Sequence, residues 1–486
     1  MVKLAEIKEY AQIPFYEFMK TKLGTKHSFI FSHDKTVRWG WGLYVGLSVT
    51  NGFGYIECVD KDLLFALGKA VNADVSKITH NGHSFVVEMA VEQPFVWLGA
   101  LSDYLYKDLL ITSPLIGYVG SPSYSYIVDV EQKPEKAPTY VCPDFYFHIP
   151  LLEIIYGEDH KLVVENRSRV SKQEILNDIS SFEYEAKNLI PDCLRDLRNV
   201  KWDDISKNIS IIPSDQVYEE QVQKVVDCLT REGAEKVVIS RLASGRFTGK
   251  PSKLFEVLRA CSPTRYEFLF ETPNYQIVGC SPEILVQQTG KTVTVRAVAG
   301  TQVRSVDERD DQLREEDFLS DPKQIIEHLI TFIGYVKMMK NRICIPSSVR
   351  VREILNVDKL THILHLTSEI QGQTENEVYQ TWTSLLPTMN GTPAVTGYKI
   401  ALRIEEFNRG IYGGVFGFFD HEQSLFCKII RTIYLERNNF YVCAGAGITS
   451  DSKPADELTE SKNKMRSCLY ALQFVNHSQT HVEAWS

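Results

Sequence analysis

The sequence lacks the features by which membrane proteins, metal–sulfur proteins and nucleic-acid-binding proteins are usually recognised. None of its stretches reaches the about 18 consecutive apolar residues that a membrane span requires. Its ten cysteines are scattered singly from Cys58 to Cys468 without a CxxC pair, which argues against a zinc site, an iron–sulfur centre or a dense disulfide framework. The formal net charge is −9 and no long run of Lys or Arg occurs, so we expect neither a nucleic acid nor a membrane as partner.

Two further kinds of segment are missing. The N-terminal stretch MVKLAEIKEYAQIPFYEF contains acidic side chains and lacks both the apolar segment and the small-residue cleavage site of a signal peptide, so we expect a cytoplasmic protein. The segment GRFTGKPSK resembles a phosphate-binding loop, but Gly245 and Gly249 are one residue too close and Pro251 replaces the Ser or Thr that would bind magnesium. We therefore expect no nucleoside triphosphate site, and a small polar molecule or another protein as the ligand.

The apolar pattern predicts an α+β fold. Ser214 can cap a helix that ends near Gly233, and further helices are predicted over residues 321–340 and 455–474. Short apolar segments between them read as strands in hairpin-like groups rather than in strict βαβ alternation. This order favours large, mainly antiparallel sheets with flanking helices. Residues 1–205 form an N-terminal part and residues 210–475 a second region, which we expect to be intertwined in one structural unit.

An acid and an amine stand out in predicted strands. The segment from Gly279 to Val303 reads as strand, turn, strand, with Glu283 in the first turn. Glu283 is either a solvent-facing turn residue or a carboxyl in an apolar setting, with a raised pKa and able to donate a proton. Lys236 opens an apolar strand, where it is either a surface lysine or a buried amine whose pKa is lowered so that it can act as a base.

Several other charged residues have two readings. One face of the last predicted helix carries Glu457, Glu460 and Lys464. These side chains are either surface ion pairs or ligand-binding groups beside the small residues 444–447. If Glu327 in the helix over residues 321–340 faces the two glutamates, the three carboxylates suit Mg²⁺. Arg431 lies inside the predicted apolar strand KIIRTIY, where a ligand carboxylate is a candidate partner.

Ten segments, taken in order, resemble the chorismate-utilising enzymes, which include isochorismate synthase, salicylate synthase, anthranilate synthase component I and aminodeoxychorismate synthase component I. The segments are EKVVISR, GCSPE, AVAGT, DPKQIIEH, ILHLTSEIQG, GTPA, NRGIYGG, IIRTIY, CAGAGI and ELTESKNK. The resemblance covers residues 210–475, whereas the first 200 residues match loosely, with VRWGWG similar to isochorismate synthases. It implies an α/β sandwich of antiparallel sheets like that of anthranilate synthase component I, a buried site and Mg²⁺ bound to the ring carboxylate of chorismate.

The resemblance also implies roles for single residues. Glu283 matches the general acid that protonates the departing C4 hydroxyl, Lys236 the general base that activates water for attack at C2, and His365 the active-site histidine. Family members that use ammonia generally lack a lysine at position 236, and aminodeoxychorismate synthases place a nucleophilic lysine where this chain has Ala299. Both positions point to water as the nucleophile.

The remaining matched positions concern the substrate and the metal. Residues implied to line the ring pocket or to hold the two substrate carboxylates are Ala299, Gly300, Thr301, Thr388, Tyr412, Arg431, Gly445, Gly447 and Lys464. Glu327, Glu457 and Glu460 match metal-site carboxylates. The chain departs from its relatives at Gln324, where they usually carry a second acid, and at Ala394, where salicylate and anthranilate synthases tend to have lysine. We expect a weaker Mg²⁺ site and isochorismate as the product.

The expected activity is therefore that of an isochorismate synthase that uses chorismate, requires Mg²⁺, serves menaquinone or siderophore synthesis and has no glutaminase subunit. Three alternatives remain. A salicylate synthase would carry the reaction on to pyruvate release. An ammonia-using synthase would need a glutaminase partner and is disfavoured by Lys236. A chorismate-binding protein without turnover is favoured only by Gln324.

Overall fold

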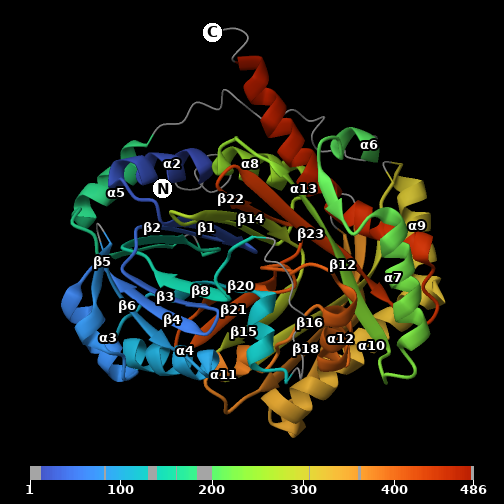
Figure 1. Cartoon of the computed structure of the whole chain (residues 1–486), viewed down its shortest axis with the longest axis horizontal. Coiled ribbons are helices and arrows are strands. Elements are labelled where there is room, and N and C mark those ends of the chain that lie inside the picture. Colours follow the sequence, from blue (N-terminus) through green and yellow to red (C-terminus); the bar gives the residue numbers. More distant parts are fainter. Residues whose placement is uncertain are drawn as a thin grey trace.

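A computed structural model describes residues 12–81, 84–129, 140–159, 161–182, 200–305, 307–359 and 363–482. Its strands form two large sheets, and every strand pairing between described residues is antiparallel (Figure 1). The predicted α+β class with large antiparallel sheets is confirmed. Among the described residues, no helix is both long and apolar enough to cross a membrane.

The first sheet has 11 strands. Its order is β10 (Leu162–Asn166), β9 (Leu152–Tyr156), β2 (Thr36–Trp41), β1 (Ser28–His33), β13 (Tyr266–Glu271), β14 (Tyr275–Ser281), β22 (Thr432–Glu436), β23 (Asn439–Ile448), β12 (Lys236–Arg246) and β11 (Ser210–Ile212), with β19 (Gly391–Thr392) also paired to β12. The sheet therefore joins strands from the N-terminal part of the chain to strands after residue 210, because β1 pairs with β13.

The second sheet has 12 strands and is built in the same mixed way. Its order is β17 (Arg350–Lys359), β18 (Ile363–Gln373), β16 (Thr292–Val303), β15 (Ile284–Thr289), β21 (Gln423–Lys428), β20 (Val415–Phe419), β7 (Leu115–Val119), β8 (Phe145–Ile149), β3 (Val45–Thr50), β4 (Phe53–Cys58), β6 (Ser84–Ala90) and β5 (Thr79–Asn81). The division of the chain into residues 1–205 and 210–475 stays a prediction.

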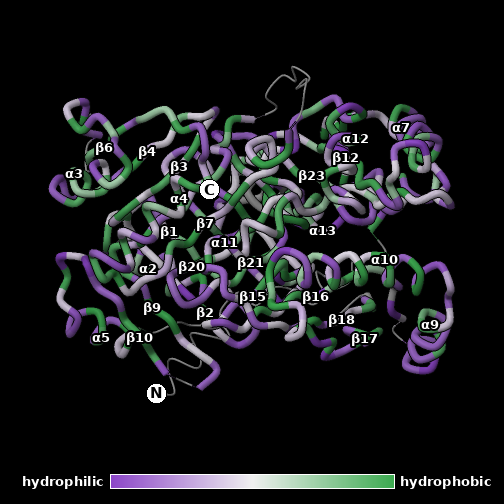
Figure 2. The backbone as a smooth tube through the Cα atoms, turned by 90° about the horizontal axis from the view of Figure 1, so that it is seen from below, coloured by the Kyte–Doolittle hydropathy of each residue, from purple (hydrophilic) through white to green (hydrophobic). Residues whose placement is uncertain are grey.

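Helices cover the outer faces of both sheets (Figure 1). They are α2 (Gln12–Leu23), α3 (Lys61–Ala70), α4 (Pro94–Asp103), α5 (Lys172–Ser181), α6 (Trp202–Ile205), α7 (Asp215–Cys228), α8 (Pro251–Cys261), α9 (Glu308–Ser320), α10 (Pro322–Met338), α11 (Val378–Thr383), α12 (Ala394–Ile404) and α13 (Pro454–Val482). Ser214 caps α7 as predicted, its hydroxyl oxygen accepting a hydrogen bond from the Val217 N–H. Figure 2 colours α9, at the edge of the molecule, mainly as hydrophilic.

Three apolar cores hold these layers together. One lies between the sheets, where Phe29 and Phe268 of the first sheet meet Phe416 of the second, and the Phe268 and Phe416 rings stack with centroids 4.3 Å apart. The second core joins the first sheet to α2, α8 and α13. The third joins the second sheet to α3, α4 and α10. The fold is thus a sandwich of two sheets between two helical layers.

The chain crosses between the sheets at two neighbouring points. β14 of the first sheet continues through Pro282 and Glu283 into β15 of the second, and β21 of the second continues through residues 429–431 into β22 of the first. The crossings are neighbours because β14 pairs with β22 and β15 pairs with β21. The segment from Gly279 to Val303 therefore contains three strands in two sheets, and the strand–turn–strand prediction is wrong.

Candidate active site

Glu283 and Arg431 lie at these two crossings. The backbone N–H of Cys280 donates to the Arg431 carbonyl oxygen at 3.2 Å, and the N–H of Lys428 donates to the Glu283 carbonyl oxygen at 2.9 Å. Arg431 was predicted within a strand, but it lies in the link between β21 and β22 and has a positive φ of 50°. In the described part of the chain, no carboxylate forms an ion pair with its guanidinium. Burial lowers the pKa of Arg431.

The Glu283 side chain forms a buried ion pair with Lys428. Lys428 Nζ lies 2.6 Å from Glu283 Oε2, and the two side chains are 6% and 15% exposed. Burial acts to raise the pKa of Glu283, but the charge and hydrogen bond of Lys428, together with the smaller contributions of His365 and Lys464, outweigh it, so the pKa is lowered. Both predicted environments of Glu283 are therefore wrong, because it is neither solvent-facing nor a carboxyl with a raised pKa.

Lys236 lies at the start of β12 and reaches α10. Its Nζ contacts Glu327 Oε1 at 2.6 Å, with the side chains 14% and 27% exposed. Burial acts to raise the pKa of Glu327, but the charge and hydrogen bond of Lys236, together with the charges of Lys464 and Lys323, outweigh it, so this pKa is lowered. A Cβ on Gly447 would lie 2.1 Å from Cε of Lys236. Gly447 thus leaves room for the amine to cross β23 toward Glu327.

The predicted charged residues of α13 face the same region. Lys464 Nζ lies 2.6 Å from Glu460 Oε1 and donates to the Gly445 carbonyl oxygen at 3.1 Å. Glu457 is buried, and burial, followed by the charges of Glu460 and Glu327, raises its pKa. A Cβ on Gly445 would lie 2.2 Å from the carbonyl oxygen of Ile239, so only glycine fits there.

Electrostatic interactions join these groups into one charged cluster. Burial opposes the charged form of Lys464, but Glu460, Glu327 and Glu283 outweigh it and raise the pKa of Lys464. Lys464 therefore lies within electrostatic reach of the acid predicted for catalysis and of two acids predicted for the metal. We define the charged cluster by its members, which are Lys236, Glu283, Glu327, Lys428, Glu457, Glu460 and Lys464.

The chemistry of three carboxylates suits a hard cation such as Mg²⁺, and the charges of Glu460 and Glu327 add to burial in raising the pKa of Glu457. Among the described residues, however, no three acidic, histidine or cysteine side chains are arranged to hold a metal ion. Two of the three carboxylates are paired with lysines, Glu327 with Lys236 and Glu460 with Lys464. Carboxylate oxygens are ligands that Mg²⁺ prefers, so the residue types fit the ion, although their present arrangement does not hold it.

His365 lies in β18 beside a bulge of β16. Its Nδ1 lies 3.1 Å from the carbonyl oxygen of Gly300, which has a positive φ of 83°. Burial and the Arg431 charge lower the pKa of His365 to about 4, so the ring is neutral near pH 7. The β16–β18 register shifts between Ala299 and Thr301, and Thr301 stands opposite His365. The bulge thus brings three residues of the predicted ring pocket next to this histidine.

The backbone around the bulge is held from α10. The Ala299 carbonyl oxygen lies 3.2 Å from Nδ1 of the buried His328, whose Nε2 lies 2.7 Å from Ser368 Oγ. A Cβ on Gly300 would lie 3.0 Å from Oε1 of Gln324. Gln324, the residue that departs from the family pattern, therefore faces the Gly300 backbone.

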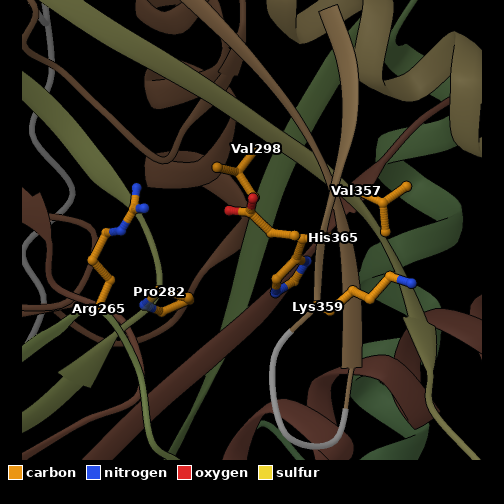
Figure 3. Close-up of a pocket in the computed structure, with 7 residues that line it drawn as sticks. Arg265, Pro282, Val298, Val357, Lys359 and His365 are labelled. Carbon is orange, nitrogen blue, oxygen red and sulfur yellow. The ribbon is translucent and has the colours of Figure 1, made fainter. Parts of the chain in front are cut away.

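A pocket of about 400 Å³ opens beside His365. Its lining residues are Arg265, Pro282, Val298, Val357, Asp358, Lys359 and His365. Figure 3 shows His365 between Pro282 and Lys359 in this view. His365 is the only predicted site residue in that lining, although Pro282 precedes Glu283 and Val298 precedes Ala299. The pocket therefore adjoins the charged cluster without containing it.

Two further residues predicted to bind the substrate are Thr388 and Tyr412. Thr388 lies in the loop before α12, directly after the cis peptide bond between Leu386 and Pro387, and Tyr412 lies in the turn before β20. Thr388 is buried, and its carbonyl oxygen accepts a hydrogen bond from Asn390 Nδ2 at 2.7 Å. Tyr412 is buried under the Arg409 guanidinium, which lies 5.9 Å from the ring centroid. Burial raises the pKa of Tyr412.

Lys428 was not predicted from the sequence. Its signal was present, because Lys428 ends the apolar segment SLFCK and the cost of burying an unpaired lysine applies to it as it does to Arg431. The partner could not be inferred, since Glu283 is 145 residues away.

The chain is similar to known proteins in both sequence and structure. A family model described as chorismate binding enzyme matches residues 77–470. Anthranilate synthase component 1 of Lactococcus lactis is 31% identical over 374 residues, which cover 74% of this chain and 80% of that protein. In structure, anthranilate synthase component I from Streptococcus pneumoniae matches with a TM-score of 0.66 at 22% identity, over 91% of this chain and 92% of that one.

A putative 2,3-dihydroxybenzoate-specific isochorismate synthase from Bacillus anthracis matches with a TM-score of 0.60 at 19% identity, over 94% of this chain and 99% of that one. These two structural matches show a shared fold. The family model spans most of the sequence, including both crossings and every member of the charged cluster. The chain therefore belongs to the family of chorismate binding enzymes.

Proposed function

We propose that this chain is an isochorismate synthase, which converts chorismate to isochorismate by attack of water at C2 and loss of the C4 hydroxyl. The observation that carries the proposal is the half-buried Lys236, whose amine crosses Gly447 and contacts Glu327 within the charged cluster. Once this lysine has given up its own proton, the neutral amine can take a proton from water, whereas the ammonia-using relatives generally lack a lysine here. Ala299 supports the same proposal, because it leaves no nucleophilic lysine in the bulge.

In this proposal, one residue acts as the acid and another as the base, and the remaining residues bind the substrate. Glu283 protonates the departing hydroxyl and Lys236 accepts the proton of the attacking water. Arg431, which forms no ion pair with a carboxylate of the described residues, binds one substrate carboxylate together with Tyr412. Lys464 and the backbone at Gly445 and Gly447 bind the other. Ala299, Gly300, Thr301, Thr388 and His365 line the space for the ring.

Glu327, Glu457 and Glu460 would hold Mg²⁺. The bound ion would supply positive charge for the ring carboxylate of chorismate and for the repelling glutamates. Since Lys236 contacts Glu327 and Lys464 contacts Glu460, a metal ion held by these glutamates would compete with both lysines. Metal binding and release of the base are thus coupled in this proposal.

The test is to incubate the pure protein with chorismate and Mg²⁺, with and without an ammonium salt, and to identify products by chromatography, mass and ultraviolet spectrum. We expect an isomer of chorismate in both samples, loss of conversion with a chelator, and recovery when Mg²⁺ is added back. Salicylate with pyruvate would identify a salicylate synthase. Binding of chorismate in calorimetry without conversion would identify a protein that has lost turnover.

Anthranilate synthase component I is the second candidate, favoured by the similarity to the Lactococcus lactis protein. It would require ammonia, which a glutaminase partner would deliver, whereas the isochorismate synthase proposal needs no such subunit. Anthranilate formed only in the sample with ammonium would decide for this candidate.

A further inference from the structure

The Lys428–Glu283 pair is fixed more firmly than the other ion pairs of the charged cluster. Backbone and side chain act together, because the Lys428 N–H donates to the Glu283 carbonyl oxygen at 2.9 Å while Nζ contacts Oε2 at 2.6 Å. Lys428 ends β21, and Glu283 directly precedes β15, which pairs with it. The ladder between these strands therefore holds the ammonium against the carboxylate.

Among the residues that the structure describes, Lys428 forms an ion pair with no acid other than Glu283. Its Nζ lies 5.7 Å from the ring centroid of Tyr335 in α10, a largely buried residue. Facing Glu283 are His365 of β18, Arg431 of the second crossing and Lys464 of α13. The carboxylate thus has cations or a histidine around it and Lys428 as its only contact within hydrogen-bond distance from a side chain of the described residues.

This arrangement creates a chemical problem for the proposed reaction. Burial lowers and the Glu283 charge raises the pKa of Lys428, and the net direction is upward, while that of Glu283 is downward. The proton therefore resides on nitrogen in the free protein. A carboxylate in this state cannot protonate a departing hydroxyl until it receives a proton.

We propose that Lys428 is a positioning residue that keeps Glu283 ionised in the free protein and, once substrate is bound, passes it the proton that Glu283 delivers to the C4 hydroxyl. This inference rests on the proposed function. An Nζ–H bond breaks and an Oε–H bond forms on Glu283, which then gives the proton to the oxygen of the breaking C4–O bond, so that water leaves. The attacking water forms the C2–O bond and gives its proton to Lys236, and solvent restores both lysines.

Two substitutions separate the passing of a proton from simple charge pairing. Lys428→Arg keeps a cation that can bond to Glu283 but cannot release a proton, so we expect kcat to fall about 100-fold at every pH while KM changes less than about threefold. Lys428→Met removes the cation and leaves burial as the largest influence on Glu283. We expect kcat of this variant to stay within about tenfold of wild type near about pH 6 and to fall about tenfold per pH unit above the raised pKa.

Lys20→Met is the matched control, because Lys20 forms a comparable pair with Glu271 at 2.5 Å, in the part of the fold where α2 covers β13. We expect its kcat and pH profile to equal those of wild type. A Lys428→Arg variant with more than about half of the wild-type kcat, or a Lys428→Met variant with the wild-type pH profile, would overturn the inference.

A measurement without turnover keeps the inference testable if the product is not isochorismate or if a variant is unstable. The wild-type protein is labelled with ¹³C at its glutamate carboxyl groups and observed by NMR. The signal of Glu283 is the one that is missing from the spectrum of Glu283→Gln. We expect it to titrate at lower pH in wild type than in Lys428→Gln, and equal titration in both overturns the inference. Absence of isochorismate from wild type, by contrast, overturns the proposed function alone, because anthranilate and salicylate formation also expel the C4 hydroxyl.

Discussion

Two lysine–glutamate pairs of the charged cluster have the same length and different surroundings. Lys428–Glu283 and Lys464–Glu460 both span 2.6 Å, but the first pair is 6% and 15% exposed and the second 41% and 46%. The inner pair joins two strands at a sheet crossing, whereas the outer pair joins residues four apart on α13. Exposure to solvent rather than distance therefore distinguishes the two pairs.

The largest effect is expected for the acid of the inner pair. Glu283→Gln keeps the shape and a hydrogen-bond acceptor but removes the proton donor, so kcat should fall about 10²–10⁴-fold. Glu460→Gln is the comparison in the outer pair, and its loss should be smaller and recover as Mg²⁺ is increased. Initial rates over a range of Mg²⁺ concentrations measure both. A Glu283→Gln rate within about tenfold of wild type would refute the role of this acid.

The next effect concerns stability. Lys428→Ala leaves a buried carboxylate without its cation and should lower the free energy of unfolding by about 3–5 kcal/mol. Lys464→Ala removes a cation from the exposed pair and should cost about 0–1 kcal/mol. Urea unfolding followed by tryptophan fluorescence compares them. Equal losses in the two variants would contradict the distinction between an inner and an outer pair.

A smaller effect is expected from the two glycines of β23. Gly447→Ala would push against the flexible end of Lys236, so the amine moves and activity should fall about tenfold, with the melting temperature nearly retained. Gly445→Ala would push against the backbone of Ile239, which cannot move aside, so it should destabilise the fold. Thermal melts and rates measured on both variants test the contrast. A Gly447→Ala protein with full activity would show that Lys236 does not need its present path.

The smallest effect is a pH dependence. The pKa of Glu283 is lowered on folding, so its stabilising contribution is present above the unfolded pKa of about 4.3 and is lost as pH falls through the folded pKa. The stability difference between wild type and Glu283→Gln should be constant from about pH 6 to 8 and shrink below about pH 4. For Glu460→Gln we expect a small difference throughout. A Glu283→Gln difference that grows in acid would reverse the sign of the proposed interaction.

Local patterns in the sequence predicted much of the fold. The spacing of apolar residues after Ser214 and the segment over residues 321–340 correspond to α7 and α10, and the strand groups between them are antiparallel. Sheet membership was not predictable in this way. A strand pattern shows which side chains are buried, but it does not identify the partner strand. The segment Gly279–Val303 was therefore predicted as strand, turn, strand, without the change of sheet at Glu283.

The sequence predicted which residues belong to the site, but it did not predict which lysine pairs with which glutamate. Lys236, Glu283 and Glu327 were singled out by their chemistry, and the structure brings all three into the charged cluster. The environment predicted for Glu283 was wrong because the pKa depends on Lys428, which no local pattern connects to it. Arg431 was assigned to a strand because its neighbours are apolar, although they are buried at a crossing.

The amino-acid order alone determined the α+β class, the family and the identity of the acids and amines available for chemistry, since each of these depends on local periodicity or on matching segments. The tertiary structure decided which lysine neutralises which glutamate. That choice depends on distances and burial between residues far apart in the chain, and in a buried site these two quantities set where each proton resides.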